Sequence, residues 1–86
     1  MHQYNSVNLW LSFSSKVENH IVNYTIPQYG DAGNDLATTY TPESCVGQIR
    51  KYAARFGKNS RPGQDKLDLL KIVHYAQMAY DRLPDE

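Results

Sequence analysis

The second half of the chain limits the fold most, because its apolar residues recur at intervals of three and four in two stretches separated by a short turn. Thr41 supplies a hydroxyl suited to an N-cap, and Pro42 suits the first helical position, where its missing N–H has no helical partner. Gly57 is typical of the residue just beyond a helix end. These signals predict helices over residues 42–56 and 65–83 that pack as an antiparallel hairpin.

The apolar faces of these two helices predict the core of the fold. The face of the first helix consists of Cys45, Val46, Ile49, Tyr52, Ala53 and Phe56. The face of the second helix consists of Leu69, Ile72, Val73, Ala76, Ala79, Tyr80 and Leu83. We therefore expect the following contacts in the core: Leu69, Ile72, Val73 and Leu83 against Val46, Ile49, Ala53 and Phe56.

The first half of the chain is less well specified. Residues 6–20 place their apolar side chains on one helical face, which predicts an N-terminal helix. Residues 23–40 contain Pro27, Gly30 and Gly33 and predict a long irregular loop. The pattern contains no period-two strand segment. The sequence therefore predicts a mostly α fold, in which all 86 residues form one small three-helix domain with a C-terminal hairpin and a long loop.

Composition limits the compartment and the partners. A single cysteine, Cys45, excludes an internal disulfide and fits a reducing compartment. No apolar run approaches the roughly 20 residues that span a bilayer, so we expect a cytoplasmic protein without a membrane partner. Nine basic residues balance nine acidic ones, which makes general nucleic-acid binding a weak hypothesis. Because so short a chain buries a small core, we also expect a homo-oligomer.

Positive charge is concentrated in residues 48–71, where seven lysines and arginines face two aspartates. Arginine offers a planar fork to phosphate and lysine a point charge, and the N-terminus of the second helix offers unpaired N–H groups. The candidate phosphate or nucleotide contacts are Lys51, Arg55, Lys58, Arg61 and Lys71, with Tyr75 as a base or hydroxyl contact. The alternative is a solvated face in which Arg55 and Asp68 form a structural ion pair.

Other site chemistries have little support. The chain lacks the glycine-rich pattern of a P-loop, and its histidines and cysteine do not occur at metal-ligand spacing, so no metal site is predicted. Asp65 is expected to cap the second helix and Asp68 to pair with a cation, rather than to hold Mg²⁺. Mg²⁺ is expected only if a nucleotide binds. No pattern identifies a catalytic residue, so enzymatic activity is left open.

Residues 41–83 also resemble a known family. The segments Lys51-Tyr52-x-x-Arg55-x-Gly57-Lys58 and Asp68-Leu69-x-Lys71-x-x-x-Tyr75 are similar to the pattern of the phage family called domain of unknown function 3310. Gly47 also matches, whereas Gln48 stands where the pattern has asparagine, and the acidic stretch before the pattern is not recognisable in residues 23–40.

A version of that domain forms the C-terminal part of a nucleotide kinase of short-tailed coliphages. The resemblance therefore implies a phage or prophage origin and a link to nucleotide metabolism. The leading hypothesis is a phage-type accessory protein that binds nucleotide or phosphate at the basic end of the hairpin. The alternative is a non-catalytic interaction module that binds an acidic protein of the host or phage.

Overall fold

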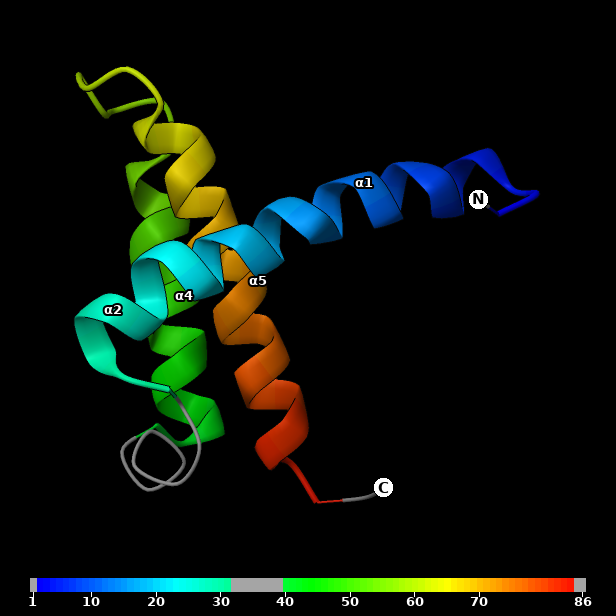
Figure 1. The fold of residues 1–86 in the computed structure, drawn as a ribbon. Helices are drawn as coiled ribbons and strands as arrows, with labels where there is room; N and C mark the ends of the chain where they lie inside the picture. Colours follow the sequence, from blue (N-terminus) through cyan, green and yellow to red (C-terminus); the bar gives the residue numbers. More distant parts are fainter. Residues whose placement is uncertain (1, 32–39, 85–86) are drawn as a thin grey trace. The chain divides into compact units, whose positions relative to one another are not determined.

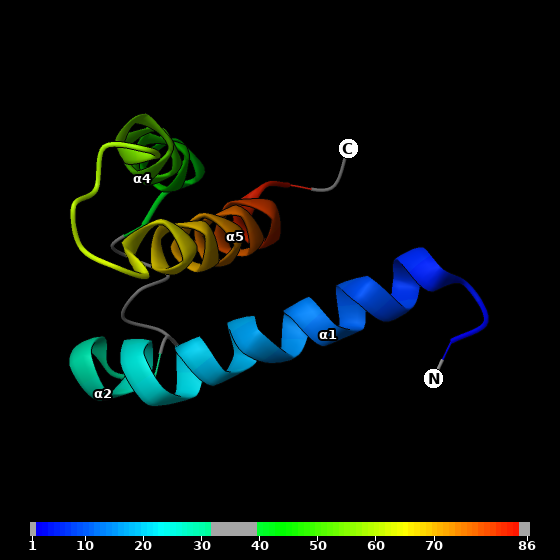
Figure 2. The same ribbon diagram turned by 90° about the horizontal axis from the view of Figure 1, so that it is seen from above.

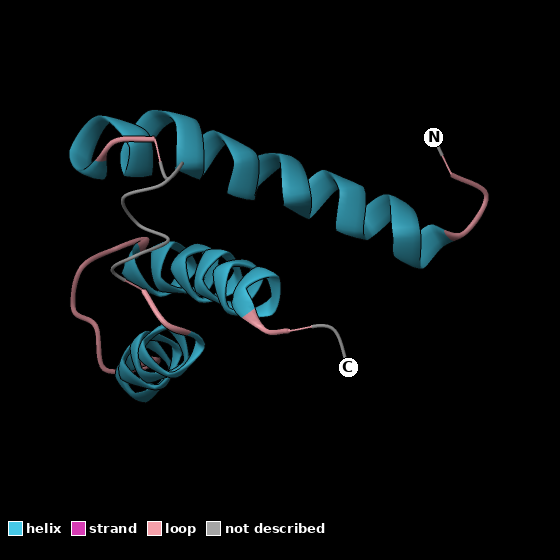
Figure 3. Ribbon diagram, turned by 90° about the horizontal axis from the view of Figure 1, so that it is seen from below, coloured by secondary structure: helices cyan, strands magenta, loops and turns pink. Residues whose placement is uncertain are grey.

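The computed structural model describes residues 2–31 and 40–84, and these residues form helices and connecting loops without a strand (Figures 1 and 3). The predicted mostly α fold is therefore confirmed. The chain divides into two compact units, Met1–Asp31 and Ala32–Glu86, and each is described by itself. That the whole chain forms one domain stays a prediction. Within the described ranges, no helix combines the length and the apolar character needed to cross a membrane.

The first unit is one helical rod (Figure 2). It begins with α1 (Asn5–His20), continues through a π-helical turn, η1 (Ile21–Thr25), and ends with α2 (Ile26–Tyr29). Gly30 stops the rod with a φ of 82°, a conformation that glycine adopts without steric cost.

The rod corrects the predicted loop. Residues 23–29 were expected to be irregular because of Pro27, yet they are helical. Proline lacks an N–H, and its ring collides with the carbonyl four residues earlier, here that of Asn23. The π-helical turn widens the backbone just before the ring, which lets the helix pass the proline. In the rest of the predicted loop, Gly30, Asp31 and Tyr40 lie outside helices, and residues 32–39 lie outside the described residues.

The second unit contains the predicted hairpin. Helices α4 (Pro42–Arg55) and α5 (Gln64–Arg82) lie side by side and run in opposite directions (Figure 1). Thr41 caps α4 as expected, since its Oγ1 accepts the Ser44 N–H at 3.1 Å.

The core of this hairpin differs from the predicted one. Cys45, Met78 and Ala79 are buried together, and Tyr40 and Tyr75 pack against them. Cys45 and Ala79 belong to the predicted apolar faces, but the eight residues predicted to meet in the core are only half-buried or exposed. The half-buried ones are Ile49, Ile72 and Val73, and the exposed ones are Val46, Ala53, Phe56, Leu69 and Leu83.

Compared with the predicted arrangement, the two helices are rotated about their own axes. The reason is that polar and aromatic residues occupy the surface along which the helices meet. On α5 the buried stripe runs through Asp68, Met78 and Ala79. Asp68 precedes Leu69 by one residue, so the apolar face of the sequence pattern lies about 100° from the carboxylate around the helix. Because Asp68 is buried with its hydrogen-bond donors, that apolar face turns toward the flank of the hairpin.

We expect Cys45 to resist alkylation in the native protein. Its side chain is fully buried, and this burial raises the pKa of the thiol, an effect that the positive charge of Arg82 partly opposes. The folded chain therefore holds the thiol proton to higher pH than the unfolded chain. Stability should be unaffected below the ordinary thiol pKa of about 8.5, and it should fall as the pH rises through the raised value.

Two measurements check this behaviour. Thiol-reagent kinetics in rising denaturant should follow the population of unfolded chain. Cys45→Ala should lose the part of the alkaline pH dependence that comes from the thiol. A native protein that reacts as fast as the denatured chain would show that the thiol is accessible.

Candidate functional site

Three cationic side chains from both helices of the hairpin surround one tyrosine ring. Lys51 Nζ and Arg55 Cζ each lie 5.3 Å from the centroid of the Tyr52 ring, and Lys71 Nζ lies 5.1 Å from it. These distances fall within the range of cation–π attraction, which stabilises positive charge over a ring face. We call Lys51, Arg55 and Lys71 the cation cluster. The structure thus brings together three of the five predicted phosphate contacts.

Tyr52 is held by a row of tyrosines in the hairpin. Its ring stacks on Tyr75 at a centroid distance of 6.2 Å and an interplanar angle of 17°. Tyr75 in turn meets the ring of Tyr40 edge to face at 5.6 Å. Tyr75 is half-buried in this row, so it has a packing role. Its predicted role as a base or hydroxyl contact stays a prediction.

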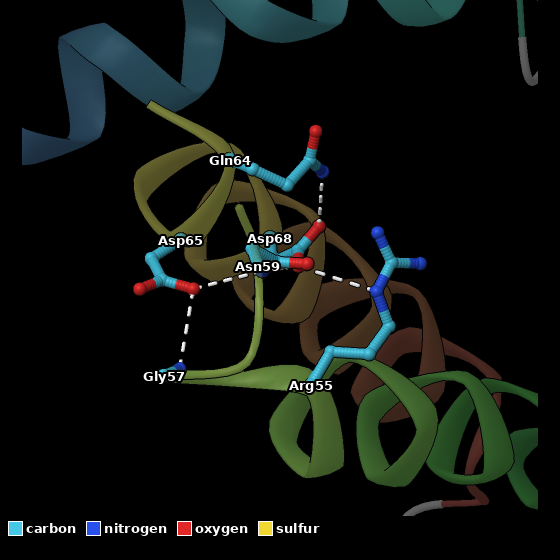
Figure 4. Close-up of polar contacts among 6 residues, drawn as sticks. All are labelled: Arg55, Gly57, Asn59, Gln64, Asp65 and Asp68. Atoms are coloured by element: carbon cyan, nitrogen blue, oxygen red, sulfur yellow. Dashed lines mark hydrogen bonds and ion pairs between the residues drawn. The ribbon is translucent and has the colours of Figure 1, made fainter. Parts of the chain in front are cut away.

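Asp68 lies at the loop end of the hairpin and is almost fully buried, with 2% of its surface exposed. Its carboxylate accepts hydrogen bonds from Gln64 Nε2 at 2.8 Å and from Asn59 Nδ2 at 3.0 Å (Figure 4). The Arg55 Nε atom lies 3.7 Å from Asp68 Oδ2, so the two residues paired in the sequence analysis are within ion-pair distance. These hydrogen bonds and the nearby guanidinium compensate the buried carboxylate for its lost contacts with water.

Asp65 extends the same network toward the loop. Its Oδ1 atom accepts hydrogen bonds from Asn59 Nδ2 at 2.8 Å and from the Gly57 N–H at 3.4 Å (Figure 4). Asp65 and Asp68 therefore bring two carboxylates to the first turns of α5, where the helix dipole favours negative charge. Carboxylates at this helix end repel a phosphate. The geometry therefore does not favour phosphate binding by the N–H groups at the N-terminus of α5, which the sequence analysis predicted.

The remaining candidates lie elsewhere. Lys58 and Arg61 are exposed in the loop between the helices and do not belong to the cation cluster. Within residues 2–31 and 40–84, no three histidine, cysteine, aspartate or glutamate side chains gather as metal ligands. The absence of a metal site stays a prediction.

The sequence analysis missed Tyr52, Asn59 and Gln64 as site residues. Two of them carry a recognisable signal. Gln64 precedes Asp68 by four residues, a spacing at which helical side chains meet. Tyr52 precedes Arg55 by three residues, a spacing at which side chains on α4 also meet. The loop residue Asn59 has no such periodic signal.

Comparisons with protein families, with curated proteins and with solved structures find no match to this chain. The resemblance of residues 41–83 to the phage family therefore stays a prediction.

Proposed function

We propose that the second unit binds the phosphate group of a nucleotide-like ligand at the cation cluster. The observation that supports this proposal is the convergence of Lys51, Arg55 and Lys71 on the ring of Tyr52 at 5.1–5.3 Å. Three cations that meet from two helices repel one another, and an anion between them relieves that repulsion. The resemblance to the phage family adds support for a nucleotide as the source of the phosphate.

Arg55 is positioned for such a contact. Its Nε atom faces the buried Asp68 carboxylate, while its two terminal nitrogens point away from Asp68 (Figure 4). The side chain is 41% exposed, so these nitrogens can reach a ligand. Asp68 would then orient Arg55, and the guanidinium would bind phosphate oxygens through paired N–H groups. Lys51 and Lys71 would add charge without a strict geometry.

The site favours phosphate recognition over base recognition. One face of the Tyr52 ring stacks on Tyr75, and the three cations lie around the same ring. A nucleobase would therefore compete with Tyr75 and the cations for the Tyr52 ring. We expect affinity for triphosphates and pyrophosphate to exceed affinity for nucleosides. Mg²⁺ would arrive with the nucleotide.

A thermal-shift titration tests the proposal. Pyrophosphate and ATP, each with and without Mg²⁺, should raise the melting temperature of the full chain. A ligand at 100 times its Kd adds about 2.7 kcal/mol to the free energy of unfolding. Lys51→Ala and Lys71→Ala should remove most of this shift, because each deletes one cation of the cluster.

The matched control is Lys66→Ala, which removes an exposed lysine of α5 outside the cluster. This variant should keep the full ligand-induced shift. If millimolar pyrophosphate and ATP leave the melting temperature of the parent protein unchanged, the phosphate site is wrong. The interaction module for an acidic protein would then replace it as the leading hypothesis.

A further inference from the structure

The loop that joins α4 to α5 gives the hairpin a basic tip (Figure 1). Lys58 and Arg61 are exposed in this loop, and Lys66 is exposed in the first turn of α5. In the part of the chain that the structure describes, none of these three cations forms an ion pair. Their charges are therefore available to an anionic partner.

The two carboxylates near these cations are engaged within the hairpin. Asp65 Oδ1 accepts hydrogen bonds from the Gly57 N–H and from Asn59 Nδ2, and Asp68 is buried with its own donors. Residues 48–71 contain seven basic residues against these two aspartates. The zero net charge of the whole chain therefore does not describe this segment, whose local field attracts anions.

Contacts within the hairpin hold the loop in place. The Asn59 amide donates to Asp65 at 2.8 Å and to Asp68 at 3.0 Å, so the middle of the loop is tied to α5 (Figure 4). Gly57 and Gly63, near the two ends of the loop, adopt positive φ values of 79° and 80°, which glycine takes without steric cost. The loop cations thus lie on an ordered backbone, which reduces the entropy that binding would cost.

An exposed aromatic ring accompanies the cations. Phe56 directly follows α4, two residues before Lys58, and 60% of its surface is exposed. Aromatic rings among cations are typical of surfaces that bind single-stranded nucleic acid, because bases stack on the ring while the cations contact phosphates. An acidic protein segment would use the cations and leave the ring without a role. We call Phe56, Lys58, Arg61 and Lys66 the tip surface.

We propose that the tip surface binds single-stranded nucleic acid. The three cations contact phosphates of the strand, and Phe56 stacks on a base. A duplex carries the same phosphates, but its base faces are covered by neighbouring base pairs, so it binds more weakly. The tip surface shares no residue with the cation cluster, and the proposal therefore does not rest on the proposed phosphate site.

Fluorescence anisotropy with the full chain tests this proposal. The probes are labelled oligothymidylate and oligouridylate of about 12 nucleotides, within the usual range of single-strand site sizes. Both probes should bind at about 50 mM salt, and the logarithm of the affinity should fall with the logarithm of the salt concentration with a slope of about −2, as three phosphate contacts predict. Comparing the probes shows whether DNA or RNA is preferred.

The cations are tested by a double substitution. Lys58→Ala combined with Arg61→Ala should weaken binding by about tenfold or more at low salt and reduce the slope to about −0.7, because one phosphate contact is left. Arg50→Ala is the matched control, since Arg50 is an exposed cation of α4 outside the tip surface. This control should keep both the affinity and the slope.

The ring is tested separately. Phe56→Leu should weaken binding by about fivefold or more while the salt slope stays unchanged, because it removes stacking and keeps the charges. Phe56→Tyr should retain the affinity of the parent protein, since it keeps an aromatic face. Tyr80→Leu is the matched control, because Tyr80 is 79% exposed on α5 away from the loop. It should bind like the parent protein.

Four outcomes would overturn the proposal. The first is no binding of either probe at low salt. The second is equal affinity for single strand and duplex together with no effect of Phe56→Leu. The third is displacement of the probe by polyglutamate as effectively as by unlabelled strand, which would indicate an acidic protein as the partner. The fourth is loss of strand binding in Lys51→Ala and Lys71→Ala but not in the tip variants. Failure of the phosphate site would instead appear in the pyrophosphate titration, which does not depend on the tip surface.

Discussion

Asp68→Ala is expected to lower the free energy of unfolding by about 2–4 kcal/mol, because it leaves several polar groups without their acceptor. Asn59 and Gln64 lose hydrogen bonds to the carboxylate, and Arg55 loses its ion-pair partner. The carboxylate is 2% exposed, so water does not easily replace it. Chemical denaturation followed by circular dichroism measures this loss.

Two further substitutions sharpen the test. Asp68→Asn keeps a carbonyl acceptor but removes the charge, so it should cost less, about 1–2 kcal/mol. Asp81→Ala removes an exposed carboxylate of the same helix and should change stability by less than about 0.5 kcal/mol. Equal effects of the Asp68 and Asp81 substitutions would contradict a structural role for the buried network.

Met78→Ala is the second substitution with a large expected effect, about 2–4 kcal/mol. Met78 is 5% exposed and packs with Cys45 and Ala79, so truncation leaves a cavity in the buried core of the hairpin. A chain this short is expected to have a total stability of only about 5–10 kcal/mol, so this loss should lower the melting temperature by many degrees.

Leu69→Ala provides the contrast, since it shortens an aliphatic side chain that is 43% exposed. We expect it to cost less than about 1 kcal/mol. If Leu69→Ala proved more costly than Met78→Ala, the core would follow the sequence pattern rather than the packing described above.

Local chemistry made the helices of the hairpin predictable. The Thr41 hydroxyl and the fixed φ of Pro42 act within one turn, so they define the start of α4 without reference to tertiary contacts. Pro27 misled the prediction because the same residue that usually ends a helix can be tolerated after a π-helical turn. Sequence periodicity does not reveal such a turn.

The rotation of the helices was not predictable from hydrophobicity. A pattern at intervals of three and four identifies an apolar face, but it does not show whether that face meets the neighbouring helix. By hydrophobicity alone, Asp68 is assigned to the protein surface. Its burial depends on its hydrogen-bond donors, and one of these donors, Asn59, belongs to the irregular loop. Arg55 was predicted as the partner of Asp68, whereas its amide donors Asn59 and Gln64 emerged only from the three-dimensional structure.

The candidate site was also predictable only in part. Lys51 and Arg55 share a helical face by spacing, and the hairpin brings Lys71 toward them. The ring on which they converge was missed, because a tyrosine among apolar residues is indistinguishable from a core residue by pattern alone.

The contact between α4 and α5 changes character along its length, and this variation fixes how far one helix can slide along the other. The loop end is joined by the Asp68 carboxylate and its donors, the middle by Tyr52 and Tyr75, and the far end by Cys45 and Met78. A shift of one helical turn, about 5.4 Å, would carry the carboxylate away from its amide donors and toward the aromatic pair. Two uniformly apolar stripes would tolerate several such alignments, whereas a buried polar group selects one. The buried polar network thus fixes the register of α4 against α5. This comes at the expense of the stability that an all-apolar contact would add.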